Sequence, residues 1–597
     1  AMTRRPLRPL PRILSARAAG ENPDAIEAEN LRARQEARRD RLRLRAEGRL
    51  FVLGLCFFCA FVVVGARMAH LAASEPMEPR VAAVGQTILA QRADITDRKG
   101  RILATNLSTY ALYAHPHQMV EPVRAAEELA RIFPDLEAEA LTRRFTGDRK
   151  FVWIKRKLSP EQMQAVHDIG EPGLLFGPRE MRLYPNGNLA AHVLGGTRFG
   201  VQAVHAAEVL GSAGIEKAYD DYLRDPALAG APLALSLDLT VQAAARQVLE
   251  GGMKLLNAKG ASAVLMDVHT GEIVSMVSLP DFDPNDRPRP LTEGAAEDSP
   301  LFNRALQGVY ELGSVFKIFT VAQAIELGLV GPDTPVDTSG PMKVDGFTIR
   351  EFRNKDFGEI TAADIVVKSS NRGTGRLALQ IGAERQKDFL ARLGLFDPTQ
   401  VELVEAPAHE PLVPRTWPKS TAVTVSYGHG ISVSPLHLAA AYASLLNGGT
   451  TVRPTLLRQS GPQMGERIVS PQVSEAARDM LRRVVIDPDG TASFAEVPGY
   501  AVGGKTGTAD KPRPDGGYYD DRVIATFASV FPSDRPEYVL IVTLDEPVET
   551  SGTRPRRTAG WTAVPVAAEM IRRVAPLLGL RPERPPIDAE ALVATAQ

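Results

Sequence analysis

Three short strings carry the groups that could perform chemistry in this chain: Ser314-Val315-Phe316-Lys317, Ser369-Ser370-Asn371 and Lys505-Thr506-Gly507. In the first string, Lys317 follows Ser314 at the spacing that places two side chains on one face of a helix. A lysine amine with a lowered pKa can take a hydroxyl proton and so make serine a nucleophile. We therefore predict Ser314 as a nucleophile and Lys317 as its base. The alternative, a capping serine with a solvated lysine, is disfavoured because the surrounding stretch is apolar.

The second string adds two polar side chains that can act together. Ser369 lies near the end of an apolar stretch that opens with the capping box Thr361-x-x-Asp364. Ser369 and Asn371 are two positions apart and can point the same way from a turn. They would then supply a hydroxyl relay and an amide that both donates and accepts hydrogen bonds. A helix-terminal turn without a chemical role is the alternative for this string taken alone.

The third string offers a cation and hydroxyl groups. If the segment forms the edge of a sheet, Lys505, Thr506 and Thr508 suit a carboxylate-bearing substrate, and Gly507 leaves room for the substrate backbone. Residues 499–506 also match the phosphate-binding pattern G-x-x-x-x-G-K-[ST], which requires a helix directly after it. Residues 507–517 contain two prolines and three glycines and cannot form a regular helix. We therefore reject a nucleotide site.

The elements that must position these strings are predicted from their apolar patterns. Helices are expected at 315–327, ended by Gly328, at 241–256, capped by Thr240, and at 436–446, with Ser434 as the cap. Strands are expected around 233–239, at 261–268 and 273–279 as a hairpin, and at 524–530 and 538–544. Strands at both sequence ends with helices between them predict a mainly antiparallel sheet flanked by helices, and hence an α+β fold.

An uncharged apolar run at 50–66, extended to residue 73, is long enough for one transmembrane helix. Residues 1–49 hold thirteen arginines against seven acidic residues, which predicts a cytoplasmic N-terminus and a catalytic part outside the inner membrane. A cleaved signal peptide is the alternative, but the leader is too long for one. Cys56 and Cys59 lie inside this run, where we expect them to pack rather than bind metal.

Bulk properties exclude some functions and divide the chain. A net charge of −1 over 597 residues argues against a protein that coats nucleic acid, and the ten scattered histidines predict no metal site. The expected domains are an Arg-rich segment at 1–49, either a solvated helix or disordered, and an anchor at 50–73. Next comes a mixed α/β pedestal module at 74–230, with strands on both sides of a turn at Lys99-Gly100. It is followed by a catalytic domain at 231–580 and a loose tail at 581–597.

In this order the three strings resemble those of penicillin-binding proteins and serine β-lactamases: S-x-x-K, a Ser/Asp-containing triplet and K-T-G. The chain resembles most closely the class B penicillin-binding proteins, and among these the septal, FtsI-like branch. The resemblance extends from the anchor to about residue 570. It includes residues 92–104, Arg182-Leu-Tyr-Pro185, 190–192, Gly214-Ile-Glu216, Asn303-Arg-Ala305, 428–435 and Asn447-Gly-Gly449.

The resemblance implies a D,D-transpeptidase that cross-links peptidoglycan stem peptides, is acylated by β-lactams and needs no cofactor. It also implies a dimerisation-like pedestal and, as partners, an FtsW-like glycan polymerase and other membrane proteins of the divisome. The implied roles are acyl nucleophile (Ser314), proton acceptor (Lys317), proton relay and amide holder (Ser369, Asn371), carboxylate binding (Lys505, Thr506, Thr508) and further substrate contacts (Ser370, Gly507). The backbone N–H groups of Ser314 and Thr508 would hold the oxyanion.

Two departures from the family pattern are visible, Leu312 in place of a common proline and Ala93-Asp94 in place of a glycine-containing pair. Neither removes a reacting group. A membrane-anchored β-lactamase or a β-lactam sensor would share the three strings. An elongation-type class B transpeptidase is a further alternative, and the septal assignment rests on Ser369-Ser370-Asn371, the Tyr310-Glu-x-Gly lead into Ser314 and the long Arg-rich leader. A scaffold with an inactive site is opposed by the intact Ser, Lys and Lys-Thr-Gly set.

Overall fold

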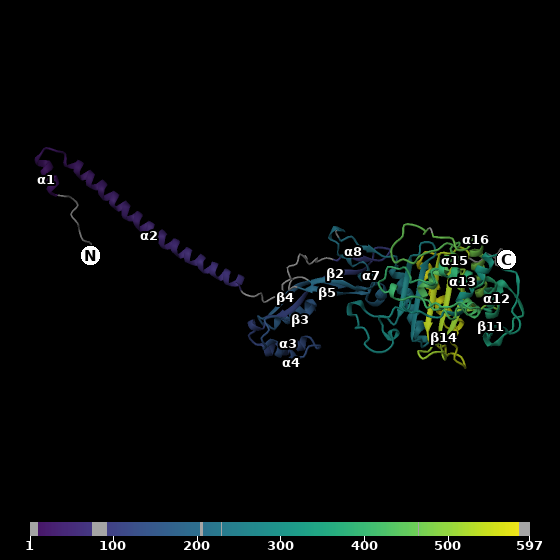
Figure 1. Ribbon diagram of the computed structural model, residues 1–597. Coiled ribbons are helices and arrows are strands. Elements are labelled where there is room, and N and C mark those ends of the chain that lie inside the picture. The colour runs from purple at the N-terminus through teal and green to yellow at the C-terminus, as the bar shows by residue number, and fades with distance from the viewer. Residues whose placement is uncertain (1–9, 74–91, 203–206, 229, 464, 584–597) are drawn as a thin grey trace, which may run out of the picture. The chain divides into compact units, whose positions relative to one another are not determined.

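The computed structural model describes residues 10–73, 92–202, 207–228, 230–463 and 465–583. It divides into two units, residues 1–78 and residues 79–597, each described here by itself. Figure 1 shows the elements along the chain. The predicted tail at 581–597 falls outside the described residues from residue 584 onward, as do residues 74–91 at the start of the predicted pedestal module.

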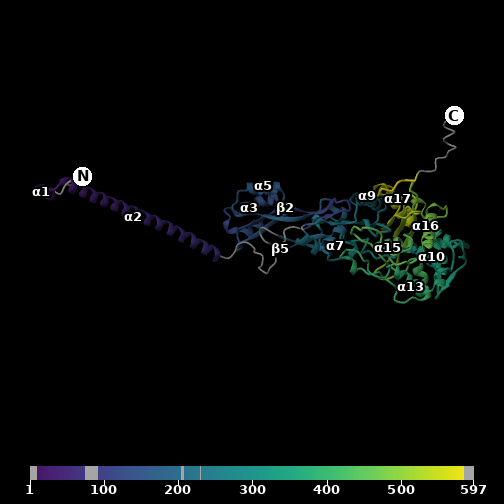
Figure 2. The same ribbon diagram turned by 90° about the horizontal axis from the view of Figure 1, so that it is seen from above.

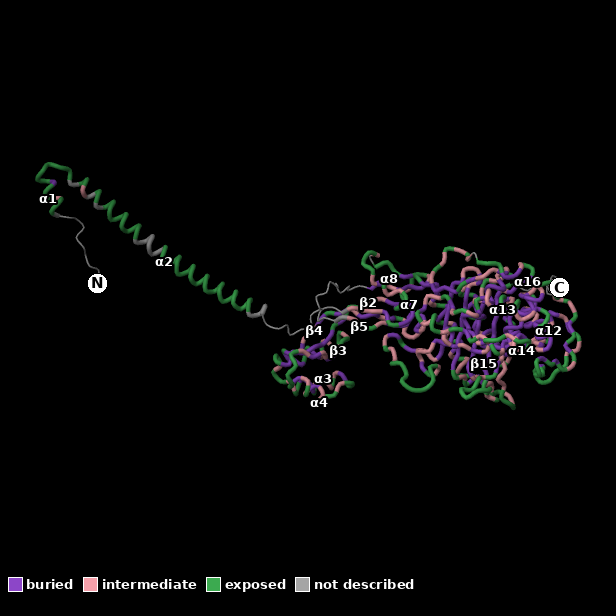
Figure 3. The backbone as a smooth tube through the Cα atoms, in the orientation of Figure 1, coloured by how far each residue is buried: buried purple, intermediate pink, exposed green. Residues whose placement is uncertain are grey.

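The first unit is helical. After α1 (Leu10–Ala18), the chain forms the single long helix α2 (Pro23–Ala73), which contains residues 23–49 of the arginine-rich leader together with the apolar run. The described residues of the leader, from residue 10 onward, are mainly helical, in agreement with the first of the two alternatives. Residues Glu47–Ala69 have a mean hydropathy of 2.4 and are long and apolar enough to cross a membrane. Their side chains are exposed along the helix (Figure 3), as expected of a segment whose apolar surface needs a hydrocarbon environment.

The second unit begins with the pedestal. Its main sheet has the order β3-β2-β1-β7, with β4 also paired to β2, and a separate hairpin joins β5 to β6. Three short helices cover it around a small apolar core that includes Leu112, Leu129 and Val166. The strands are β1 (Ile95–Thr96), β2 (Ile102–Ala114), β3 (Val152–Leu158), β4 (Leu174–Leu183), β5 (Gly196–Gln202), β6 (Ala207–Ala213) and β7 (Leu233–Ala234), and the helices are α3 (Pro122–Ile132), α4 (Ala138–Phe145) and α5 (Pro160–Asp168).

Several family motifs of the pedestal meet at one buried carboxylate. Glu216 is fully buried, and its two oxygens accept from Arg92 Nε at 2.6 Å and Arg182 Nε at 2.7 Å. Tyr184 contributes its hydroxyl at 3.3 Å. A buried charge is tolerated only when paired and hydrogen-bonded, so these residues depend on one another. The motifs thus hold the pedestal together.

The catalytic part is built on a five-stranded antiparallel sheet of order β14-β15-β16-β8-β9. The predicted hairpin and both late strands are present, and the strands from the two sequence ends pair directly through β16 and β8. The third string lies on β14, the edge strand, as predicted, and no helix follows it. The strands are β8 (Gly260–Asp267), β9 (Ile273–Leu279), β14 (Gly503–Pro512), β15 (Tyr518–Phe531) and β16 (Tyr538–Asp545).

Helices lie around this sheet (Figure 2), and the strands β8 and β9 are buried almost throughout. The helices α9 and α17 pack against each other and against the sheet, while α15 packs on β8 and β16, and α16 packs on β14. Strands that are buried on both faces have nearly continuous apolar sequences, and this accounts for the apolar runs of β8 and β9. The helices are α9 (Leu239–Leu255), α10 (Lys317–Glu326), α15 (Pro435–Leu446), α16 (Pro471–Ile486) and α17 (Ala563–Leu577).

The local predictions were right in most places and wrong in three. Ser434 caps helix α15 with a complete capping box. Gly328, two residues beyond the last residue of α10, adopts φ +67° and ends that helical segment as predicted. The predicted cap Thr240 is wrong, because Asp238 caps α9 by accepting from Thr240 N and Val241 N. The expected strand at 233–239 is reduced to β7, and the expected helix at 315–327 starts as the 3-10 turn Gly313–Phe316.

Candidate active site

Two hydrogen bonds from distant segments hold the turn that carries Ser314. Gly313 adopts φ +63° and donates its N–H to Gly428 O at 3.2 Å. Tyr442, fully buried in α15, donates its hydroxyl to Val315 O at 2.7 Å. Ser314 itself is half-buried in the 3-10 turn that leads into α10, with its flanking residues in the core. The nucleophile therefore sits on a rigid turn, at a helix start whose dipole favours negative charge.

Gly507 lets the edge strand approach this turn closely. A Cβ added at Gly507 would lie 2.1 Å from Leu312 O and 2.9 Å from Val315 Cγ1. The space that we assigned to a substrate backbone is therefore occupied by the chain's own backbone, and the expected reason for this glycine is corrected. Leu312, which precedes the serine turn, is fully buried.

Gly507→Ala is expected to slow acylation and to lower the stability of the domain by about 1–3 kcal/mol, because the new methyl group forces β14 away from Ser314. Calorimetric Tm and the acylation rate with a labelled penicillin would measure both effects. Gly251→Ala is the matched control, since Gly251 lies in α9 with nothing within 4 Å of the added Cβ. A Gly507→Ala protein with the wild-type Tm and acylation rate would contradict the close-packing explanation.

Lys317 brings the first and second strings together. Its fully buried amine donates to Asn371 Oδ1 at 2.7 Å, to Ser369 Oγ at 3.1 Å and to Ser369 O. Ser369 adopts φ +61°, a left-handed conformation that is costly for a residue with a side chain and that is common at functional sites. That conformation turns both its carbonyl and its hydroxyl oxygen toward the same amine.

Lys505 reaches the same hydroxyl from β14. Its Nζ donates to Ser369 Oγ at 3.1 Å, so Ser369 Oγ lies between the two lysine amines. Burial lowers the pKa of Lys317 to about 7, partly opposed by the negative charge of Glu351. Burial and the nearby charge of Lys317 hold the pKa of Lys505 well below its usual value. A neutral Lys317 can accept a proton, and an incoming carboxylate would restore the charge of Lys505.

The remaining predicted site residues, Thr506, Thr508 and Ser370, lie on the same elements as the residues around Ser369 Oγ. Thr506 Oγ1 is 2.8 Å from Thr491 Oγ1, and Thr508 Oγ1 accepts from Ala559 N at 3.0 Å. Ser370 is fully buried and donates to Glu351 Oε1 at 2.6 Å, so its hydroxyl is directed away from any substrate. Ser314 Oγ makes no hydrogen bond to Lys317 Nζ in the described part of the chain, where the amine is directed to the second string.

Sequence reasoning missed the residues that support the site from outside the strings. Glu351 lies in an irregular loop, Thr491 follows α16, and Tyr442 is one apolar residue among many in α15. The burial of the Glu351 carboxylate would have indicated a supporting role, but burial cannot be predicted from the sequence of a loop. Among the described residues, no group of three or more His, Cys, Asp or Glu side chains is placed to hold a metal ion.

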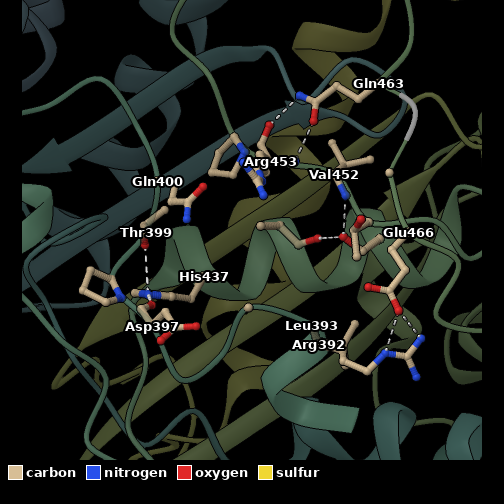
Figure 4. A pocket seen from close by; sticks show the side chains of 17 residues that line it. Arg392, Leu393, Asp397, Thr399, Gln400, His437, Val452, Arg453, Gln463 and Glu466 are labelled. Atoms are coloured by element: carbon tan, nitrogen blue, oxygen red, sulfur yellow. Dashed lines mark hydrogen bonds and ion pairs between the residues drawn. The ribbon is translucent and has the colours of Figure 1, made fainter. Parts of the chain in front are cut away.

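A cavity of about 640 Å³ lies elsewhere, between α13 (Ala383–Arg392), α15 and the loops beside them (Figure 4). None of the predicted catalytic or substrate-binding residues lines it. Its polar groups largely satisfy one another: His437 Nε2 bonds Asp397 O at 2.9 Å, and Arg392 pairs with Glu466 at 3.0 Å. Because these polar groups are paired with one another, we assign no binding or catalytic role to this cavity.

Comparisons with known proteins agree with this architecture. Residues 261–570 match the penicillin-binding protein transpeptidase domain, and residues 87–226 match the penicillin-binding protein dimerisation domain. The chain is 36% identical to the probable peptidoglycan D,D-transpeptidase FtsI of Caulobacter vibrioides, over 83% of each chain. It is 28% identical to peptidoglycan D,D-transpeptidase FtsI of Escherichia coli K12, over 77% of this chain and 80% of that one.

A solved structure shows the same arrangement. The crystal structure of penicillin-binding protein 3 from Mycobacterium tuberculosis, complexed with aztreonam, matches 83% of this chain and 98% of its own, with a TM-score of 0.62 and 27% identity. A pedestal joined to an antiparallel sheet, with a Ser-x-x-Lys turn at its edge, defines a penicillin-recognising transpeptidase. The chain belongs to the class B penicillin-binding proteins, and within these to the FtsI-like D,D-transpeptidases.

Proposed function

We propose that this protein cross-links peptidoglycan stem peptides during septal wall synthesis, through an acyl-enzyme on Ser314. The observation that carries the proposal is the meeting of Lys317 and Lys505 on Ser369 Oγ, with Asn371 Oδ1 beside them. One amine of lowered pKa is thereby placed near the serine turn, and a second buried amine lies on the edge strand where a carboxylate can be bound.

The proposed reaction has two steps. Ser314 Oγ attacks the carbonyl carbon before the terminal D-alanine, and Lys317 takes the hydroxyl proton. That proton passes through Ser369 Oγ to the departing amine, while Lys505 with Thr506 and Thr508 binds the terminal carboxylate. The terminal D-alanine leaves, and an acceptor amine then attacks the ester carbonyl; Lys317 takes a proton from that amine and returns it to Ser314 Oγ as the ester bond breaks. Backbone N–H groups of Ser314 and Thr508 would hold the oxyanion, a contribution of about 3 kcal/mol per donor.

The test is a time course with a fluorescent penicillin on the full-length protein in detergent. We expect one stable adduct, which maps by mass spectrometry to the peptide containing Ser314. Absence of an adduct on wild-type protein would contradict the proposal. Rapid loss of the adduct would favour the β-lactamase alternative, and a stable adduct without cross-linking of stem peptides would favour a sensor.

The same proposal includes membrane placement and partners. Residues 50–73 would anchor the chain once, with residues 1–49 in the cytoplasm and the pedestal (74–230), the catalytic domain (231–580) and the tail (581–597) outside. The arginine excess before the apolar run supports this direction. We further propose an FtsW-like glycan polymerase and other divisome membrane proteins as partners, and the septal rather than the elongation pathway.

A further inference from the structure

A buried carboxylate outside all three strings lies directly beneath the second string. Glu351 is 4% exposed and follows β12 (Phe347–Ile349) in an irregular segment. Two residues that follow shortly after it, Arg353 and Asn354, both adopt left-handed conformations, with φ +58° and +53°. Such conformations persist only where surrounding contacts fix them. The chain therefore accepts backbone strain next to the position where Glu351 is buried.

Among the described residues, the side-chain hydrogen bonds of Glu351 go to the start of α12 (Asn371–Ile381), the helix that follows Ser369. Its Oε2 accepts from Asn371 N at 2.7 Å. Its Oε1 accepts from Ser370 Oγ at 2.6 Å and from Arg372 N at 3.0 Å. A carboxylate at a helix N-terminus is stabilised both by these free N–H groups and by the helix dipole. Glu351 thus fixes the position of the first turn of α12.

The same segment also fixes which way the Asn371 amide points. Asn371 Nδ2 donates to Arg350 O at 3.0 Å, so Oδ1 is directed to Lys317 Nζ at 2.7 Å. Asn371 is therefore held at its backbone by Glu351 and at its side chain by the neighbouring residue. A small displacement of this turn would misdirect both Asn371 Oδ1 and the Ser369 oxygens that Lys317 contacts.

We propose that Glu351 is a positioning residue of the transpeptidase reaction, which holds Ser369 and Asn371 in the register that Lys317 requires. The proposal rests on the function proposed above. In Glu351→Gln, one amide oxygen replaces one carboxylate oxygen, but the NH₂ group faces a backbone N–H that has lost its acceptor. The residue keeps its size and loses its charge.

We expect Glu351→Gln to lower the rate constant of acylation at saturating penicillin by about 10- to 100-fold, because the reacting groups are misplaced. The dissociation constant of the preceding non-covalent complex should change less than about threefold, since Glu351 is buried away from the ligand. The pH at half-maximal acylation should move to lower pH, because the charge of Glu351 favours protonated Lys317. The charge of Lys505 on β14, which also acts beside Lys317, is kept in this variant, whereas Arg372 on α12 loses its ion pair with Glu351 Oε1 at 3.6 Å.

A matched control removes a helix cap nearby without touching the Lys317 contacts. In Thr361→Ala the cap of α11 (Ala362–Val367) is lost, since Thr361 Oγ1 accepts from Asp364 N at 3.1 Å. We expect a lowered Tm with the wild-type acylation rate constant and pH midpoint. A purely structural role for Glu351 would give the Gln variant this same behaviour.

A folded Glu351→Gln protein that acylates within twofold of wild type, with the wild-type pH midpoint, would overturn the proposal. If that variant does not fold, Ser370→Ala decides, since it removes one donor to Glu351 and keeps the carboxylate. We expect acylation slowed by about three- to tenfold in it, and the wild-type rate would overturn the proposal. A wild-type protein without any adduct would instead refute the function on which the proposal rests.

Discussion

Ser314→Ala is expected to form no covalent adduct with penicillin and to cross-link no stem peptide. The substitution removes the atom that we assign to the acyl bond. The other hydroxyls of the site are already engaged: Ser369 Oγ accepts from both lysine amines, Ser370 donates to Glu351, and Thr508 Oγ1 accepts from Ala559 N. Non-covalent binding should persist, because the carboxylate-binding residues on β14 are intact. Gel fluorescence after labelling and a cross-linking assay on full-length protein measure these effects.

The fold should tolerate this change. Ser314 is half-buried, and its hydroxyl has no hydrogen-bond partner among the described residues, so the free energy of unfolding should change by less than about 0.5 kcal/mol. Ser551→Ala, an exposed serine, is the control and should label like wild type. An adduct that still forms on Ser314→Ala at the wild-type rate would assign the nucleophile elsewhere.

Lys317→Met is expected to slow acylation by roughly 10³-fold, within the range of a lost general base. Methionine has a similar length and is suited to a buried site, but it cannot take the Ser314 proton. It also leaves Ser369 O and Asn371 Oδ1 without their donor, so some loss of stability is expected. Stopped-flow acylation at saturating penicillin measures the rate constant. Lys254→Met, an exposed lysine of α9, is the control and should acylate normally.

The pH dependence of wild-type acylation follows from the same amine. The pKa of Lys317 is lowered to about 7, and only the neutral amine accepts a proton. The acylation rate constant should therefore rise with pH through about 7 and level off above it. A rate that is constant from about pH 6 to about pH 9 would exclude Lys317 as the base.

Much of the fold was predictable because its signals are local. The hairpin of β8 and β9, the late strands β15 and β16, the cap at Ser434 and the stop at Gly328 all follow from apolar periodicity and turn chemistry. The errors were local as well. Asp238 and Thr240 are both good caps, and choosing between them requires knowing where the chain enters the helix.

The candidate site was predictable as a set of residues but not as an arrangement. The order and types of residues in the three strings indicated a serine, its base, a relay and a cation before any contact was known. Their spacing could not show that Lys317 and Lys505 share Ser369 Oγ, because these residues come from a helix, a turn and an edge strand far apart in the chain.

The sequence by itself determined the family, the reacting groups and the segment long and apolar enough for a membrane anchor, since these depend on residue types, their order and an apolar run. Only the tertiary structure decided what surrounds the reacting groups. It buried Ser370 on Glu351, filled the space beside Gly507 with the Leu312 carbonyl, and removed both lysines from water. The physical reason is that burial and close backbone contact arise from segments distant in sequence, and the pKa of Lys317 depends on that burial.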